Sequence, residues 1–228
     1  MKQLFLLPLA FITLTANAQK TNGSAAKWQV GVCFSPDATN SNNQGTPFLY
    51  RTSFGFATGL NASRKLNKQF RVDAGLLYAQ RGEKMENLVW GWHYRQNGFN
   101  DDTLYSIKYK HKLIEIPVKL KWYFKQGNNF NLYTTLGVSA NFYDVTKVKE
   151  TFYNSTTKEV FFHTLHNESN LLGKLFPSAI IGIGVEYKLN AKLSIVVQPE
   201  YRYYLISTFG YIETLTALGV NCGVSYNL

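Results

Sequence analysis

The sequence predicts an all-β protein: an eight-stranded antiparallel up-and-down transmembrane β-barrel with short periplasmic turns and long extracellular loops. Three observations predict it, namely period-2 alternation of apolar and polar residues, strict alternation of short and long connections, and an N-terminal export signal. The 228 residues are 45% hydrophobic, 15% aromatic and 17% charged, which suits one domain with a sizeable core. This composition excludes a disordered chain, and two cysteines exclude a disulfide scaffold.

The first segment has the pattern of a secretory signal peptide. Lys2 precedes an apolar run over residues 4–14, and the small residues of Ala16-Asn17-Ala18 follow. We therefore expect cleavage between Ala18 and Gln19, with a signal peptide over 1–18 and an outer membrane β-barrel domain over 19–228. Beyond this point no stretch approaches the roughly 20 apolar residues of a membrane helix. Hydropathy alone leaves a soluble secreted protein and a membrane barrel open, because inward and outward residues alternate along a barrel strand.

Eight segments alternate apolar and polar residues with the period of a strand that has one apolar face. In each segment one face carries apolar and aromatic residues, and the other carries glycine, small polar and charged residues. No segment has a competing helical pattern. The segments are Trp28–Phe34, Phe54–Ser63, Phe70–Arg81, Ile114–Phe124, Phe130–Phe142, Ile181–Lys188, Ser194–Tyr203 and Leu218–Leu228.

Short and long connections alternate strictly between these segments. The short connections contain Asn or Gly, as tight hairpins require, and are Asn67–Gln69, Lys125–Asn129 and Asn190–Lys192. The long connections are Ser35–Thr52, Gly82–Lys110, Asp144–Pro177 and Ile206–Thr216. This order is typical of a membrane barrel that has both termini in the periplasm.

Charged residues collect on one face of the predicted strands. A soluble lipocalin-type barrel would turn this face to water, whereas a membrane barrel would turn it inward. The opposite face is too continuous and too aromatic to fill an eight-stranded interior, and its aromatic residues gather at the segment ends as in interfacial girdles. We therefore predict a lumen network in which acids pair with bases, because unpaired buried charges are costly. Its members are Arg71, Asp73, Glu115, Lys119, Lys121, Glu186, Lys188, Glu200 and Arg202.

Several short motifs, in their order along the chain, resemble the PorT-type outer membrane β-barrel family. They are the run Leu113-Ile114-Glu115-Ile116-Pro117, the strand Gly182–Tyr187 followed by a Leu-Asn turn, and the ending Gly223-Val224-Ser225-Tyr226. The resemblance covers about Trp28–Leu228. It implies a barrel in the outer membrane of a Gram-negative cell envelope, with some relatives linked to secretion or gliding machinery. The chain departs from the family in ending on Leu228 rather than on an aromatic residue.

Catalytic and metal-binding patterns are weak. The serines of Gly137-Val138-Ser139 and Gly223-Val224-Ser225 lack the closing glycine of a nucleophile elbow. His163 and His166, with Glu168 nearby, lack a strong third ligand for a metal. His111 and Glu115 are the only candidates for catalysis with a defined placement, and a structural interior network is the favoured interpretation. We expect no catalytic residue, no metal and no cofactor. A narrow pore and a surface-exposed outer-membrane enzyme stay open as alternatives.

The formal net charge of +10 indicates an anionic partner. Export makes nucleic acid implausible, and basic residues near the loops instead suit outer membrane lipid and lipopolysaccharide. These residues are Lys84, Arg95, Lys108, Lys110, Lys112, Lys147 and Lys149. An aromatic run in the second long loop is a candidate sugar- or protein-binding tip, or a loop that packs on itself, and comprises Trp90, Trp92, His93, Tyr94 and Phe99. We expect a monomeric, non-enzymatic protein of the cell outer membrane whose outer loops bind a partner, an envelope protein among the candidates, or whose body serves a secretion or envelope assembly.

The two cysteines fall on opposite faces of the predicted sheet. Strand closure brings Cys33 and Cys222 near each other, and an oxidising compartment favours a disulfide. However, the alternation places Cys33 on the lumen face and Cys222 on the lipid face, so their side chains point apart. We therefore predict two free thiols, each buried separately.

Overall fold

The computed structural model describes residues 28–42, 49–86, 102–154, 160–168, 175–205 and 214–228. Within these ranges the regular structure consists of strands, and no helix is long and apolar enough to cross a membrane. The predicted signal peptide, with Ala18 and Gln19 at its cleavage point, lies outside the described residues. The strands are β1 (Trp28–Asn42), β2 (Leu49–Arg51), β3 (Ser53–Lys65), β4 (Phe70–Glu86), β5 (Asp102–Gln126), β6 (Phe130–Asn154), β7 (Val160–Glu168), β8 (Leu175–Lys188), β9 (Leu193–Tyr204) and β10 (Thr214–Asn227).

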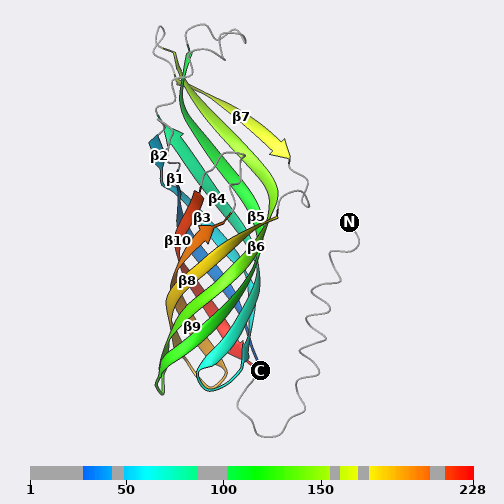
Figure 1. Cartoon of the computed structure of the whole chain (residues 1–228), viewed down its shortest axis with the longest axis vertical. Helices are drawn as coiled ribbons and strands as arrows, with labels where there is room; N and C mark the ends of the chain where they lie inside the picture. Colours follow the sequence, from blue (N-terminus) through cyan, green and yellow to red (C-terminus); the bar gives the residue numbers. More distant parts are fainter. Residues whose placement is uncertain (1–27, 43–48, 87–101, 155–159, 169–174, 206–213) are drawn as a thin grey trace, which may run out of the picture.

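Eight of these strands close into an antiparallel barrel (Figure 1). Going round the barrel the order is β1, β3, β4, β5, β6, β8, β9 and β10, so each strand pairs with the next barrel strand along the chain. The barrel closes where β10 returns to β1, in a register that runs from Gln29↔Asn227 to Asn42↔Thr214. The predicted fold class is confirmed.

Three tight turns join strands at one end of the barrel, which we call the turn end. In two of them an asparagine side chain closes the turn: Asn67 Oδ1 accepts from the backbone N–H groups of Gln69 and Phe70, at 2.8 Å each. Asn190 Oδ1 accepts in the same way from Lys192 N–H at 2.9 Å and Leu193 N–H at 2.8 Å. The sequence Lys-Leu-Asn precedes both turns, at residues 65–67 and 188–190. It therefore forms the same turn twice, each closed by an asparagine side chain.

The barrel is apolar outside and polar inside. Leu60, Leu136 and Leu218 are 63%, 66% and 61% exposed, whereas Glu115, Asn141 and Ser178 on the inner face are fully buried. A soluble domain would bury the leucines and expose the glutamate. The period-2 alternation of the sequence therefore separates a lipid-facing surface from a polar lumen, as expected for a membrane barrel.

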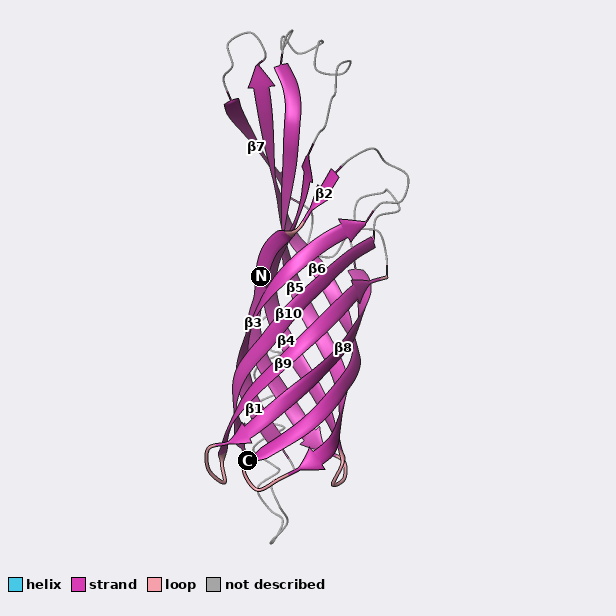
Figure 2. Cartoon of the chain, turned by 90° about the vertical axis from the view of Figure 1, so that its left-hand side faces the viewer, coloured by secondary structure: helices cyan, strands magenta, loops and turns pink. Residues whose placement is uncertain are grey.

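The strands differ from the predicted segments at the end opposite the turns, which we call the loop end. The long connections are present, but much of their length is strand. β1 continues past Phe34 to Asn42, and β5 begins at Asp102 within the predicted loop Gly82–Lys110. β4, β5 and β6 rise beyond the rim of the barrel, where β2 pairs with β4 and β7 pairs with β6 (Figure 2). We call this five-stranded sheet, β2-β4-β5-β6-β7, the outer extension.

Cys33 and Cys222 lie on paired strands without forming a disulfide. Cys33 is opposite Gly223, and Cys222 is opposite Phe34. Both thiols are free, which confirms that part of the prediction. The expectation that both are buried is wrong for Cys222, because its side chain is exposed on the outer surface of the barrel, while Cys33 is half-buried.

Candidate functional site

The most distinctive chemistry of the described residues lies inside the barrel, where Glu115 on β5 binds two arginines. Arg81 on β4 donates from Nε to Glu115 Oε1 at 2.9 Å. Arg202 on β9 donates from Nη1 to Glu115 Oε2 at 2.6 Å. Because β5 and β9 are not neighbours in the sheet, the second ion pair crosses the lumen.

Each of the two arginines also binds a second acidic residue. Arg202 also binds Glu200, with Nη2 and Oε1 2.9 Å apart, and Glu200 binds Lys119 Nζ at 3.1 Å. Arg81 also forms an ion pair with Asp37 on β1. The six charges therefore alternate in sign from Asp37 to Lys119 along one continuous path, which we call the lumen ladder.

A second group of ion pairs lies nearer the turn end. Asp73 Oδ2 and Lys121 Nζ are 3.1 Å apart, and the Ser63 hydroxyl donates to Asp73 at 2.6 Å. Glu186 binds Arg71 at 3.5 Å and accepts a 2.9 Å hydrogen bond from the Tyr123 hydroxyl. Each buried carboxylate of this group thus has both a cation and a neutral donor.

The positive and negative charges of the two groups of ion pairs are equal in number. The ion pairs of the two groups contain five cations, Arg71, Arg81, Lys119, Lys121 and Arg202, and five anions, Asp37, Asp73, Glu115, Glu186 and Glu200. Burying ten charges is favourable only when each is paired and further hydrogen-bonded. The charges of these ten residues therefore cancel one another.

Apolar side chains fill the lumen toward the loop end. Leu77, Leu113, Phe176 and Tyr204 are at most 3% exposed and belong to one cluster, together with Ala57, Ala79, Leu215 and Ala217. The Phe176 and Tyr204 rings are 5.6 Å apart between centroids. The Tyr204 hydroxyl also donates to Glu115 at 3.3 Å, which joins this cluster to the lumen ladder.

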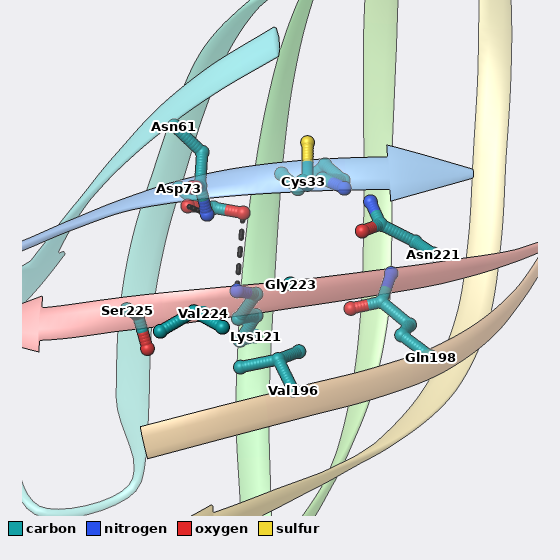
Figure 3. Close-up of a pocket in the computed structure, with 11 residues that line it drawn as sticks. Cys33, Asn61, Asp73, Lys121, Val196, Gln198, Asn221, Gly223, Val224 and Ser225 are labelled. Carbon is teal, nitrogen blue, oxygen red and sulfur yellow. Dashed lines mark hydrogen bonds and ion pairs between the residues drawn. The ribbon is translucent and has the colours of Figure 1, made fainter. Parts of the chain in front are cut away.

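A small cavity lies beside the Asp73–Lys121 ion pair (Figure 3). Its volume is about 20 Å³, and its lining includes Cys33, Gln198 and Asn221. This volume is enough for about one water molecule. The cavity is too small for a solute, so we assign it no ligand.

Eight of the nine residues predicted for the lumen network take part in these ion pairs, and Lys188 does not. Its ammonium group lies at the turn end and donates to the Gly127 carbonyl at 3.1 Å. Asp37 and Arg81 also belong to the network, although the predicted strands ended at Phe34 and Arg81 and so did not include them in it. Continuing the odd-numbered face from Cys33 would have found Asp37, and the same alternation from Arg71 and Asp73 would have included Arg81.

The structure describes only some residues of the other candidate sites. The aromatic loop residues lie outside the described residues, as do the side chains of His163 and His166. His111 is 1% exposed, at the loop end of the lumen face of β5. Among the side chains that the structure describes, no group of three or more His, Cys, Asp or Glu residues is placed to hold a metal ion. The geometry described here thus supports a packed structural interior more than a reactive one.

Sequence comparison decides the family. The model of the outer membrane protein beta-barrel domain matches residues 17–210, which is most of the chain. The chain belongs to this family. Its lipid-facing apolar surface and its polar lumen are therefore those of an outer-membrane protein, with the turn end in the periplasm and the loop end outside the cell. No protein of curated function shows significant sequence similarity to it.

Among the solved structures compared, Neisserial surface protein A supports the fold, and the two others, with TM-scores below 0.5, support no inference. Neisserial surface protein A is 10% identical, with a TM-score of 0.52 over 90% of this chain and 100% of that one. OprG from Pseudomonas aeruginosa is 15% identical, with a TM-score of 0.44 over 90% and 97% of the two chains. The outer membrane protease OmpT from Escherichia coli is 8% identical, with a TM-score of 0.41 over 92% and 99%. At these identities the likeness concerns the fold alone.

Proposed function

We propose that this outer-membrane barrel is a closed, non-enzymatic anchor that presents its outer extension to an envelope protein partner. The observation that carries the proposal is the lumen ladder, because ion pairs from β1, β4, β5 and β9 meet across the interior. The apolar cluster fills the same lumen toward the outer end. A steady pore would require these buried charges to separate, at a large cost in free energy.

The geometry of Glu115 and His111 supports the non-enzymatic part of the proposal. Glu115 Oε1 accepts hydrogen bonds from Arg81 and Tyr204, and Oε2 accepts from Arg81 and Arg202, so all four acceptor positions of the carboxylate are filled and none is left to take a proton from a substrate. The side chain of His111 is buried on the lumen face of β5 rather than open to solvent. Neither residue has the access that a surface enzyme needs.

The outer extension supports the binding part of the proposal. Its five strands continue beyond the barrel rim, and β2 and β7 form its two edges. Rigid strands that stand above a membrane hold loops and edges in fixed positions for a partner. Together with the resemblance to PorT-type barrels, this favours a role in secretion or another envelope assembly. The expected signal peptide over residues 1–18 is part of the same proposal.

Crosslinking in intact cells tests the binding role. Val160 on the edge strand β7 is 55% exposed and is replaced by a photo-reactive phenylalanine derivative. We expect a crosslink to one defined envelope protein. Leu136, 66% exposed on the lipid-facing surface, is the matched control and should give no protein adduct. Equal adducts at both positions, or none at Val160 and at the edge residue Arg51, would contradict the proposal. So would a hydrolytic activity that is lost on substitution of His93, His111 or His163.

A further inference from the structure

Lysines line up across three strands of the outer extension. Lys84 on β4 is paired in register with Lys108 on β5, which is paired with Lys149 on β6. Two residues nearer the barrel along each strand, Lys110 on β5 is paired with Lys147 on β6. Directly paired residues project from the same face of a sheet, and so do residues two apart on one strand. The five lysines therefore form two adjacent rows on one face, which we call the basic face.

The basic face continues the lipid-facing surface of the barrel. On β5 the outward positions Ile116, Val118 and Leu120 are 41%, 47% and 43% exposed. The same alternation, continued toward the outer end, passes Ile114 and reaches Lys112, Lys110 and Lys108 without a register shift against β4. The lysines thus begin where the apolar band of β5 ends, which is the level at which lipid headgroups meet the outer surface of a membrane barrel.

This arrangement costs stability when the protein is alone. Like charges directly opposite each other on paired strands are destabilising, and the basic face contains three such contacts. Partial burial, with the neighbouring ammonium groups of Lys110, Lys84 and Lys149, lowers the pKa of Lys108. Glu86 offsets part of the charge by binding Lys84 and Arg51 at the edge of the patch. An anion placed over the two rows would reduce the repulsion between the paired lysines.

We propose that the basic face binds the phosphate groups of lipopolysaccharide in the outer leaflet. Paired side chains lie about 5 Å apart across strands, and successive outward residues about 7 Å apart along a strand. Two or three ammonium groups therefore reach one phosphate group, while the acyl chains of the same molecule cover Ile116 and Val118 below. This binding is independent of the envelope protein partner, because it uses the side of the extension rather than its edge strands.

A charge-neutral variant tests the proposal in the purified, detergent-folded barrel. The variant carries Lys108→Gln, Lys110→Gln and Lys149→Gln, and the matched control carries Lys65→Gln, Lys68→Gln and Lys192→Gln at the turn end. Each protein is titrated with lipopolysaccharide, with the same lipid after chemical removal of its phosphates, and with inorganic phosphate. The gel shift between boiled and unboiled samples verifies that every variant is folded.

We expect the basic-face variant to bind lipopolysaccharide roughly a hundredfold more weakly than the wild type, since each of the three lysines contributes about fivefold near an anionic surface. The turn-end control should bind like the wild type, and the dephosphorylated lipid should bind the wild type as weakly as intact lipid binds the variant. Equal binding of intact lipid by the wild type and the basic-face variant would overturn the proposal. Inorganic phosphate bound as tightly as the lipid would also overturn it, by showing a site for a free anion.

Discussion

Arg81 and Glu115 form a two-point ion pair between neighbouring strands in the middle of the lumen. Arg81 Nε lies 2.9 Å from Glu115 Oε1, and Arg81 Nη2 lies 3.3 Å from Glu115 Oε2. Both side chains are at most 1% exposed, and each has a second partner of opposite charge, Asp37 for Arg81 and Arg202 for Glu115. Because each of the four inner charges, from Arg81 to Glu200, has two oppositely charged neighbours, the lumen ladder behaves as one unit.

Removing the central carboxylate should therefore destabilise the barrel strongly. Glu115→Gln leaves Arg81 and Arg202 facing each other without the anion between them, and we expect a loss of about 3–5 kcal/mol in the free energy of unfolding. Urea unfolding of the barrel in lipid vesicles measures this. Glu86→Gln, which breaks ion pairs at the partly exposed edge of the outer extension, is the control and should have little effect. Similar losses for the two variants would contradict a unit of coupled charges.

A charge on the lipid-facing surface should be costly only within the membrane. Leu136→Arg places a guanidinium on the outer face of β6, and we expect it to cost about 2–4 kcal/mol near the bilayer midplane. Val160→Arg makes a comparable change on exposed β7, outside the membrane, and should leave stability almost unchanged. Refolding into vesicles and urea titration report both values. A large cost at Val160 with none at Leu136 would mean that the membrane boundary is misplaced.

A close approach inside the lumen makes Gly184 sensitive to any side chain. A Cβ atom added to Gly184 would lie 2.4 Å from Tyr133 Cζ, and the Tyr133 hydroxyl donates to Gln198 Oε1 at 2.8 Å. Gly184→Ala should therefore push the ring aside and cost about 1–3 kcal/mol. Adding Tyr133→Leu makes room for the methyl group. The double variant should therefore lose less free energy of unfolding than the sum of the losses in the two single variants. Strict additivity in the unfolding free energies would contradict the contact.

The attachment of β2 to the outer extension should depend on pH. Hydrogen bonds from Lys84 and Arg51 hold the pKa of Glu86 below its usual value. A carboxylate with a lowered pKa in the folded state stabilises it above its unfolded pKa, about 4.3, and the contribution is lost as the pH falls through the folded value. Amide hydrogen exchange of Leu49–Arg51, corrected for intrinsic rates, should therefore become less protected between pH 5 and about 3. Protection in the Glu86→Gln variant should be low at both pH values. A pH dependence that survives in this variant would exclude Glu86 as the cause.

The part of the fold that lies in the membrane could be predicted because lipid imposes a pattern on the sequence. Between Phe130 and Phe142, for example, every outward residue must be apolar or small and every inward residue polar or small, so the alternation marks the strand. The tight turns could be predicted for a similar reason, since Asn67 and Asn190 supply the side-chain acceptors that such turns need.

The strands beyond the membrane could not be predicted in this way. Around Lys108 and Lys149 the outward face of the sheet carries charged residues in place of an apolar band, and the inward face buries polar residues such as Glu83 and Glu150, so the apolar–polar alternation disappears. Asp37 was missed for the same reason, because the residues around it, Ser35, Pro36 and Thr39, read as a loop. The pairing of Lys108 with Lys149 is a long-range register, which no local pattern in a single sequence contains.

Planar-bilayer recording tests the central claim, that this outer-membrane barrel is closed, most directly. Purified protein, shown to be folded by the gel shift between boiled and unboiled samples, is inserted into a bilayer under an applied voltage. Because the lumen ladder crosses the interior and the apolar cluster fills it toward the outer end, we predict no steady single-channel conductance. Reproducible, long-lived current steps that scale with the number of inserted molecules would contradict a filled lumen and identify the protein as a narrow pore.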